Sequence, residues 1–294
     1  MPAVAVEIVE CHRDFVVAFK AAGIHSAPLR PEDGECALAL VAAQFPEVRA
    51  VQGRKAVEGG LVHRIDQDTA GLLLIARNQG FYDHIMACQE AGLFKKGYTA
   101  RCQYLPSCPD LLGGFPPPPN LLGFPVTRST GFMVESGFRP YGPGRKQVRP
   151  VTEQSGKFSQ RKAGGSKQGS SPLYSTELSI TKTHGKNFVV EASITKGYRH
   201  QVRCHLAWCG LPIIGDPLYN PTKKSILQVY PDSNPINTDT PAKQSSQQMQ
   251  FFATGLSFPL MEAQETAPLR TTPKASQSSK LFSMDISSRI LSSL

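Results

Sequence analysis

The sequence predicts a mixed α+β protein. Segments typical of strands, either rich in β-branched and aromatic residues or continuously apolar, lie at 7–20, 72–75, 94–104 and 174–194, and segments of helical type lie between them. The chain has 294 residues, of which 40% are hydrophobic and 19% are charged. A chain of this size and composition can bury a substantial core, in one enlarged domain or in two small domains.

The first ninety residues are expected to contain a hairpin and two helices. Glu7–Lys20 carries a turn-like His-Arg-Asp between apolar flanks, which predicts the hairpin. Ala37–Phe45 is rich in alanine and leucine and predicts a helix that Pro46 ends. Gly80–Ala91 places apolar residues at helical spacing, and Gly92 is a natural C-cap for this second helix.

Further strands and a short helix are expected in the rest of the chain. Phe94–Tyr104 alternates enough to be a strand, and Tyr174–Ile194 predicts two strands around a turn at 184–187. A polar loop that leads into a short helix is expected over Gly197–Cys209. Pro212–Tyr219 is interpreted as an apolar turn and strand, and Gln250–Pro259 as a final strand pair.

Two stretches differ in composition from the rest. Residues 106–172 are rich in proline, glycine, serine and lysine, and their low apolar content does not offset the entropy lost on ordering. We therefore expect a partly mobile insertion there, between 1–105 and 173–262, which together form the principal domain. Residues 263–294 are predicted to be a low-complexity tail, in which only 281–294 has the pattern of a marginal terminal helix.

The formal charge of +9 is concentrated in one segment. Residues 139–167 hold eight basic residues and one acid, Glu153, which leaves +7 there and about +2 elsewhere. The basic residues are Arg139, Arg145, Lys146, Arg149, Lys157, Arg161, Lys162 and Lys167. The segment is either a binding arm for a polyanion or a solvated basic loop without a partner.

The seven cysteines favour reduced thiols, because they include no C-x-x-C pair and are odd in number. No apolar run approaches the roughly 18 residues of a membrane helix, and the N-terminal residues lack the layout of a signal peptide. A cytoplasmic, monomeric protein without a membrane partner is therefore expected.

The stretch Leu61–Ala76, LVHRIDQDTAGLLLIA, is the centre of the functional hypothesis. A polar cluster that contains Asp66 and Asp68 precedes the apolar run Leu72–Ile75, which predicts a polar loop directly before a buried strand. A carboxylate at such an edge is typical of a catalytic loop. It is also typical of a loop cap that accepts hydrogen bonds from nearby backbone amides.

The wider pattern resembles the RluA-type pseudouridine synthases. His-Arg-Ile-Asp and Thr-Ala-Gly-Leu-Leu-Leu in the central stretch are followed far downstream by Arg-His-Gln-Val-Arg-Cys-His-Leu-Ala and Pro-Ile-Ile-Gly-Asp, in the expected order. The resemblance runs from about Glu10 to Pro259. It implies a pseudouridine synthase fold, with a largely antiparallel mixed sheet, flanking helices and a central RNA-binding cleft.

The same resemblance implies the activity and the residues that carry it. Uridine in ribosomal or transfer RNA would be isomerised to pseudouridine without a metal or an organic cofactor. Asp66 matches the catalytic aspartate and Tyr98 the active-site tyrosine. Arg203 matches the arginine whose guanidinium keeps the aspartate ionised in a desolvated site.

RNA contacts are expected from several polar residues. Arg64 is the candidate to hold RNA at the gap left by a flipped-out uridine. Tyr198 stands where the family commonly has arginine, which weakens the expectation of an RNA contact there. The residues predicted to bind RNA are His63, Arg64, Arg145, Lys146, Arg199 and Gln201.

Two other functions stay open on the sequence alone. A catalytically silent RNA-binding or ribosome-assembly factor would keep the same fold. A hydrolase that uses Asp66 and Asp68 as an acid/base pair would cut a glycosidic bond and release free uracil. The sequence does not identify the RNA or the uridine position.

Overall fold

The computed structural model describes residues 5–30, 34–119, 131–155, 172–184, 187–221, 248–261 and 280–292. The chain forms two compact units. Unit 1 comprises Met1–Gly97 and Phe252–Leu294, and unit 2 comprises Tyr98–Phe251. Two strands, β4 (Lys95–Gln103) and β9 (Phe251–Pro259), run through the boundaries between the units.

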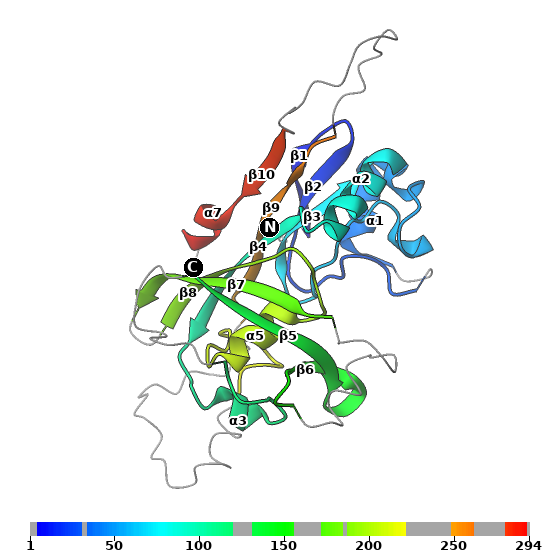
Figure 1. The fold of residues 1–294 in the computed structure, drawn as a ribbon. Coiled ribbons are helices and arrows are strands. Elements are labelled where there is room, and N and C mark those ends of the chain that lie inside the picture. The colour runs from blue at the N-terminus through cyan, green and yellow to red at the C-terminus, as the bar shows by residue number, and fades with distance from the viewer. Residues whose placement is uncertain are drawn as a thin grey trace, which may run out of the picture. The chain divides into compact units, whose positions relative to one another are not determined.

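Unit 1 is built on a mixed sheet (Figure 1). The hairpin of β1 (Val6–Cys11) and β2 (Phe15–Lys20) continues into β3 (Ala70–Ala76), with antiparallel pairing throughout. β3 pairs in parallel with β9, and β10 (Leu281–Asp285) pairs antiparallel on the other side of β9. Gly71 adopts φ 137° at the start of β3, and a Cβ there would collide with the backbone of Ala253, so the parallel pair requires glycine.

Helices of unit 1 flank this sheet. They are α1 (Ala37–Gln44) and α2 (Gln79–Glu90), with the 3₁₀ turns η1 (Pro46–Arg49) and η2 (Ala56–Glu58) between them and α7 (Ser287–Leu291) near the end of the chain. The Asn78 side chain caps α2 by accepting from the Phe81 amide at 2.9 Å. Gly92, at φ 72°, follows the helix end as predicted.

The core of unit 1 lies between β3 and α2. Every residue of β3 is buried, which explains why the strand is a continuous apolar run rather than an alternating one. Phe15 stacks on Phe81 at 4.8 Å between ring centroids, and Phe258 meets both rings edge-on. Phe282 of β10 packs against the same cluster, stacked on Phe258.

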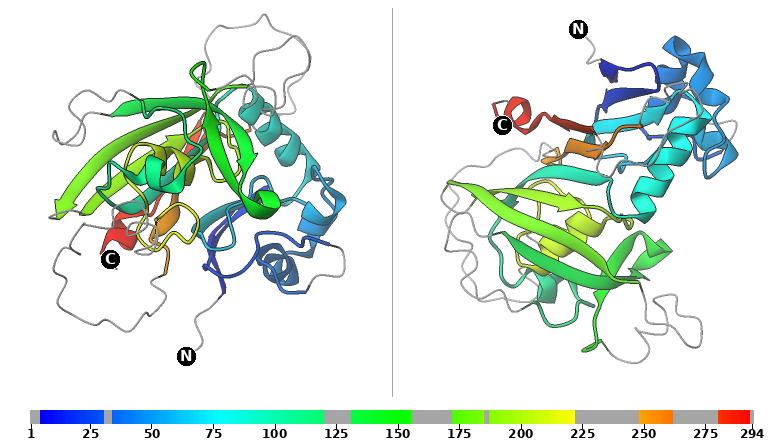
Figure 2. Two further views of the ribbon diagram at one scale, coloured as in Figure 1. Left: turned by 90° about the horizontal axis from the view of Figure 1, so that it is seen from below. Right: turned by 45° about the horizontal axis from the view of Figure 1, so that its top comes forward.

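Unit 2 holds the other strands in the order β4-β8-β7-β5-β6. β8 (Asn187–Ile194), β7 (Tyr174–His184), β5 (Phe132–Tyr141) and β6 (Gln147–Val151) pair antiparallel in succession. Two helices, α3 (Cys108–Leu112) and α5 (Gln201–Trp208), and the 3₁₀ turn η3 (Pro143–Arg145) complete the described part of this unit. α5 lies against the strands (Figure 2), and all of its residues are buried.

Most predicted elements are confirmed, including the hairpin, the buried strand before Arg77, both early helices and the short helix after His200. Three segments differ. Gln250–Pro259 contributes one strand, β9, rather than a pair, and Pro212–Tyr219 has the expected turn but only an isolated bridge at Ile213 in place of a strand. Leu281–Asp285 is a strand instead of part of a helix, because its alternating Phe282 and Met284 pack on the unit 1 core.

The range predicted to be an insertion contains regular structure. β5 and β6 lie within 106–172 and form two of the strands of unit 2, with Val134, Phe138 and Val148 buried. These apolar residues are separated by glycine, proline and arginine, so composition over the whole range concealed them. Residues 120–130 and 156–171, which include four of the predicted basic residues, lie outside the described residues.

Two further sequence predictions concern the state of the cysteines and the presence of membrane-spanning helices. All seven cysteines lie in the described ranges as free thiols. In that part of the chain, no helix combines the length and the apolar character needed to cross a membrane.

We predict that the free energy of unfolding falls as pH rises from 8.5 to 10. Burial raises the pKa of five thiols, those of Cys88, Cys102, Cys108, Cys204 and Cys209. These thiols stay protonated in the folded chain while the unfolded thiols ionise above about pH 8.5, so each one lowers stability by at most about 1.4 kcal/mol per pH unit.

Lys20 and Lys96 act in the opposite direction, because burial lowers the pKa of each to about 8. Between pH 8 and 10.5 they lose their protons in the folded chain first, which raises stability with pH. The five thiols outweigh the two lysines. Urea unfolding under reducing conditions at pH 7.5 and pH 10 measures the sum, and a protein that is more stable at pH 10 contradicts this assignment.

Candidate functional site

Asp66 lies on a short loop of unit 1 between η2 and β3, and the backbone on both of its sides is held in place. The Ser26 hydroxyl donates to the Ile65 carbonyl at 2.8 Å and accepts from the Ile65 amide at 3.2 Å. Gln67 exchanges hydrogen bonds with Gly23, since the Gly23 amide donates to the Gln67 carbonyl and the Gln67 side-chain amide donates to the Gly23 carbonyl. The loop therefore presents Asp66 in one defined backbone position.

Lys20 holds the same loop in place through hydrogen bonds to backbone carbonyls. Its ammonium is fully buried at the end of β2 and donates to three carbonyls, at 2.9 to 3.1 Å. The acceptors are Ala21, Ile24 and Gln67. Burial lowers the pKa of Lys20 to about 8, and the charges of Asp66 and Asp68 oppose this shift. Lys20 thus places a positive charge near the Asp66 carboxylate within unit 1, a role that the sequence assigned to Arg203 alone.

His63 and Arg64 share this loop. The Nε2 atom of His63 accepts from the Leu74 amide at 3.3 Å, and its ring meets Phe94 edge-on at 5.6 Å. Arg64 donates to Glu58 at 3.0 Å, yet its side chain keeps 57% of its surface exposed. An exposed pair of this kind contributes little stability and leaves the guanidinium accessible to a ligand.

Arg203 forms a buried ion pair with Asp216 in unit 2. Arg203 Nε donates to Asp216 Oδ2 at 2.8 Å and Arg203 Nη2 donates to Oδ1 at 2.9 Å, and both side chains are almost fully buried. This parallel two-bond geometry is the strongest arrangement for a guanidinium and a carboxylate. The two hydrogen bonds use one edge of the planar Arg203 guanidinium and fix its orientation.

Asp216 is itself held by the turn that follows it. Its Oδ1 accepts from the amides of Leu218 and Tyr219 at 2.8 and 3.0 Å. The Tyr219 hydroxyl accepts from the Val148 amide and contacts His200 Nδ1 at 3.2 Å, which links this turn to the residue that begins α5. The Pro-Ile-Ile-Gly-Asp motif thereby positions Arg203, a function that sequence reasoning did not assign to it.

Tyr98 lies on β4 and is 9% exposed. Its ring stacks on Phe251 with centroids 5.3 Å apart and an angle of 11° between the ring planes. This stacking fixes the orientation of the phenol ring.

Gln201 supports the fold of unit 2. It is 2% exposed, its Oε1 accepts from the Tyr198 amide at 2.9 Å, and its Nε2 donates to Ser175 and Thr176 at 2.9 and 3.0 Å. Both ends of its amide are thus used inside the unit, and RNA binding by Gln201 stays a prediction. The buried His205, which contacts Ser136 and Thr176, likewise supports the fold of the unit.

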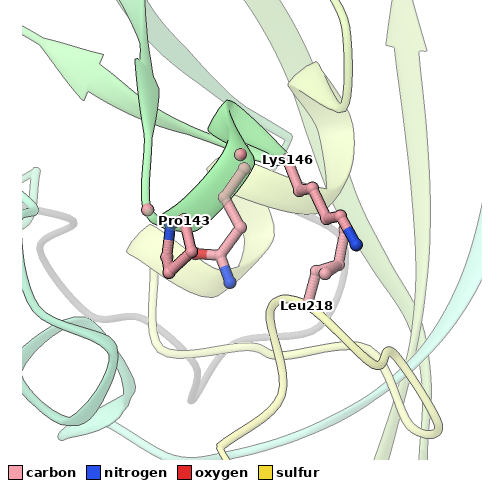
Figure 3. A pocket seen from close by; sticks show the side chains of 6 residues that line it. Pro143, Lys146 and Leu218 are labelled. Atoms are coloured by element: carbon pink, nitrogen blue, oxygen red, sulfur yellow. The ribbon is translucent and has the colours of Figure 1, made fainter.

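Arg145, Lys146 and Arg199 come together at the turn between β5 and β6. Arg199 Nη2 donates to the Arg145 carbonyl at 2.6 Å and to the Gln147 carbonyl at 3.3 Å, while Arg145 itself adopts φ 55°. A small pocket opens beside this turn (Figure 3). Its lining is Gly142, Pro143, Gly144, Lys146, Gln147 and Leu218.

Arg149 is not part of a basic surface. It is 1% exposed, its guanidinium carbon lies 4.4 and 4.2 Å from the ring centroids of Phe115 and Tyr141, and its donors reach three backbone carbonyls. The carbonyls are those of Gly113, Val148 and Leu112. Arg149 was predicted to belong to the basic arm. It is instead a core residue, and its guanidinium is too buried to contact a phosphate.

The predicted residues fall into two groups. His63, Arg64 and Asp66 share one loop of unit 1, whereas Tyr98, Arg145, Lys146, Arg199, Gln201 and Arg203 belong to unit 2. The convergence of Asp66, Tyr98 and Arg203 on one substrate stays a prediction. Among the described side chains, no group of three or more His, Cys, Asp or Glu residues is arranged to hold a metal ion.

Comparison with known proteins places these motifs in one family. A family model described as RNA pseudouridylate synthase matches residues 14–208. An "uncharacterized RNA pseudouridine synthase" of Chloroflexus aurantiacus is 28% identical over 203 residues, which cover 69% of this chain and 50% of the relative. The chloroplastic RNA pseudouridine synthase 2 of Arabidopsis thaliana is 25% identical over 59% of this chain and 33% of its own length. The chain thus spans half or less of the length of these relatives.

A solved structure shows the same fold. The human protein "RNA Pseudouridylate Synthase Domain Containing 1" aligns with a TM-score of 0.53 and 17% identity, over 93% of this chain and 86% of the human chain. At this identity the likeness concerns the fold alone. The predicted α+β pseudouridine synthase fold and the resemblance to the RluA-type family are both confirmed.

We predict that Asp216→Asn lowers the free energy of unfolding by about 3–5 kcal/mol, because it leaves the Arg203 charge buried without its counter-charge. Glu7→Gln is the matched control, since it removes a carboxylate from the exposed pair with Arg289, which contributes about 0–1 kcal/mol. Urea unfolding at pH 7.5 gives both values. Equal, small effects of the two substitutions would show that the buried pair is not what fixes Arg203.

Proposed function

The chain belongs to the RNA pseudouridylate synthase family, and we propose that it isomerises uridine to pseudouridine in RNA. The family match over residues 14–208 is the observation that carries this proposal. It includes the anchored Asp66 loop, Tyr98 and Arg203. The RNA is proposed to be ribosomal or transfer RNA, as the RluA-type resemblance implies.

The reaction needs one well-placed carboxylate. The bond between N1 of uracil and C1′ of ribose breaks, the uracil turns, and a new bond forms between C5 and C1′, after which the C5 proton leaves. The sugar carries positive charge as the first bond breaks, and a carboxylate stabilises or traps such a sugar in glycoside chemistry. Asp66 is proposed to do so at C1′.

Positioning of Asp66 is the contribution of unit 1. Ser26 and Lys20 fix the backbone on either side of Asp66, so the carboxylate does not lose loop entropy when substrate binds. The positive charge of Lys20 attracts the Asp66 carboxylate within the unit.

Arg203 and Tyr98 are proposed to complete the site from unit 2. Asp216 orients the Arg203 guanidinium, and Arg203 is proposed to keep the catalytic carboxylate ionised, as the family resemblance implies. The Tyr98 ring, whose orientation Phe251 fixes, is proposed to stack on the detached uracil, and its phenol to relay the C5 proton.

The substrate uridine must leave its helix before it can react. Arg64 extends into solvent from the Asp66 loop and is proposed to hold RNA at the vacated position. Arg145, Lys146 and Arg199 at the β5–β6 turn are proposed to bind RNA phosphates away from the reacting base.

Asp66→Asn is expected to abolish pseudouridine formation while RNA affinity persists, because the amide cannot stabilise the cationic sugar. Asp68→Asn is the matched control, since it makes the same change at an exposed position of the same loop. Tritium release from RNA labelled at C5 of uridine measures turnover, and filter binding measures affinity. Turnover by Asp66→Asn comparable to wild type would refute the assignment.

The same assay separates the other two functions. Wild-type protein that binds RNA without releasing tritium would indicate a catalytically silent RNA-binding factor. Free uracil in the supernatant would indicate a hydrolase, because isomerisation keeps the base attached to the RNA.

A double variant separates the catalytic role of Arg203 from its structural role. Arg203→Met alone leaves Asp216 buried and unpaired, so lost activity could reflect unfolding. In Arg203→Met/Asp216→Asn no charge remains at the pair, and the Asn oxygen still accepts from the amides of the turn. We expect this variant to regain stability relative to Arg203→Met and to stay at least a hundredfold less active than wild type (about 2.7 kcal/mol). Recovery of activity together with stability would show that Arg203 acts only on the fold.

A further inference from the structure

Lys96 is a largely buried cation with no hydrogen-bond acceptor among the described residues. It lies on β4 in unit 1 and is 6% exposed, and within the described ranges its ammonium donates to no carbonyl or carboxylate. Its Nζ lies over the ring of Phe94, 5.1 Å from the ring centroid. An aromatic face attracts a cation weakly and accepts no conventional hydrogen bond, so the N–H donors of this largely buried ammonium are left to water or to a ligand.

His63 presents a second buried donor beside it. Because the Leu74 amide donates to Nε2, that nitrogen is the acceptor and the proton of the neutral ring must be on Nδ1. The Nδ1 atom is buried and has no hydrogen-bond partner in the described part of the chain. Burial, together with the nearby Lys96 charge, lowers the pKa of His63 to about 3, so the ring stays neutral.

The two donors share one location. Both side chains contact the Phe94 ring, His63 by its edge and Lys96 by its ammonium. The charged group that acts on Lys96 is the exposed Arg54, whose positive charge adds to burial in lowering the pKa of Lys96 to about 8. The surroundings of Lys96 are therefore positive, and at neutral pH the lysine is itself charged.

We propose that Lys96 and His63 form a binding subsite for one phosphate group of the RNA backbone. A phosphate oxygen satisfies both unpaired donors and supplies the negative charge that this positive location lacks, whereas a base carbonyl would satisfy only the hydrogen bonds. The inference rests on the proposed function, because it takes RNA as the ligand. His63 precedes Asp66 by three residues and Lys96 precedes Tyr98 by two, so the subsite adjoins both candidate catalytic segments.

The subsite has a consequence for the free protein that a structural lysine would not have. Without its ligand, the largely buried ammonium destabilises the fold, because only part of its hydration is retained. Lys96→Met keeps the aliphatic stem and removes the charge. The free variant is therefore expected to unfold at a higher urea concentration than wild type, although its RNA affinity falls.

The experiment compares Lys96→Met with Lys95→Met, which removes the same charge from the exposed neighbouring position of β4. Affinity for bulk transfer RNA and for ribosomal RNA fragments is measured from 50 to 300 mM KCl. For Lys96→Met we expect about tenfold weaker binding at the lowest salt, as for the loss of one charged hydrogen bond. The slope of log K against log[salt] should also shrink by about 0.7 to 0.9, as for one lost phosphate contact. Lys95→Met is expected to change the slope by less than half as much.

Each outcome decides a separate question when tritium release is measured in parallel. Unchanged slope and affinity in Lys96→Met overturn the subsite and leave the isomerase proposal intact if tritium is released. A reduced slope without tritium release by wild type overturns the isomerase proposal alone. A lower urea midpoint for free Lys96→Met would show that Lys96 is a structural residue and would overturn the subsite.

Discussion

The position of the Asp66 carboxylate depends on how the chain holds one short loop. Asp66 is a loop residue, and loops are the least constrained part of most folds. Here the Ile65 amide and carbonyl are both bound by the Ser26 hydroxyl, and the Gln67 carbonyl is bound by Lys20 and Gly23. Holding the loop in this way requires the fully buried ammonium of Lys20 at the end of β2, which costs free energy of desolvation. That cost is consistent with a fold in which the position of one carboxylate matters more than stability.

A similar arrangement recurs in unit 2 around Arg203. Asp216 orients the guanidinium, the turn amides orient Asp216, and Tyr219 ties the turn to β6 and to the start of α5. In each unit a charged side chain is thus fixed by buried polar groups that are themselves satisfied. Lys96 and His63 depart from this rule, since the buried Nδ1 of His63 has no partner in the described chain and the largely buried ammonium of Lys96 lies against an aromatic ring, and that departure is what identifies them as ligand-binding candidates.

Local patterns predicted the elements whose residues are buried in a regular period. The continuous apolar run of β3, the hairpin before it and the apolar face of α2 were all legible in the sequence, because periodicity reports directly which residues are covered. β5, β6 and β10 were missed or misassigned, since their buried residues are interrupted by polar and small residues or lie in a low-complexity context.

The residues of the candidate site also divide into those that the sequence identifies and those that only the structure identifies. Asp66 and Arg203 could be identified from motifs, whereas Lys20, Ser26 and Asp216 act through contacts with residues far from them in the chain or across a turn, which no local pattern reveals. Lys20 could have been noticed in the sequence, because it is a lysine at the end of an otherwise apolar strand. Arg149 shows the converse error, because charge counting treated as surface a residue that the fold buries between two rings.

The central claim is that Asp66 performs the isomerisation, and its most direct test is a map of pseudouridines in total RNA from cells with and without this gene. Loss of the modification at a defined uridine is expected on deletion. A copy that carries Asp68→Asn should restore it and a copy that carries Asp66→Asn should not. Restoration by the Asp66→Asn copy, or an identical map without the gene, would contradict the account.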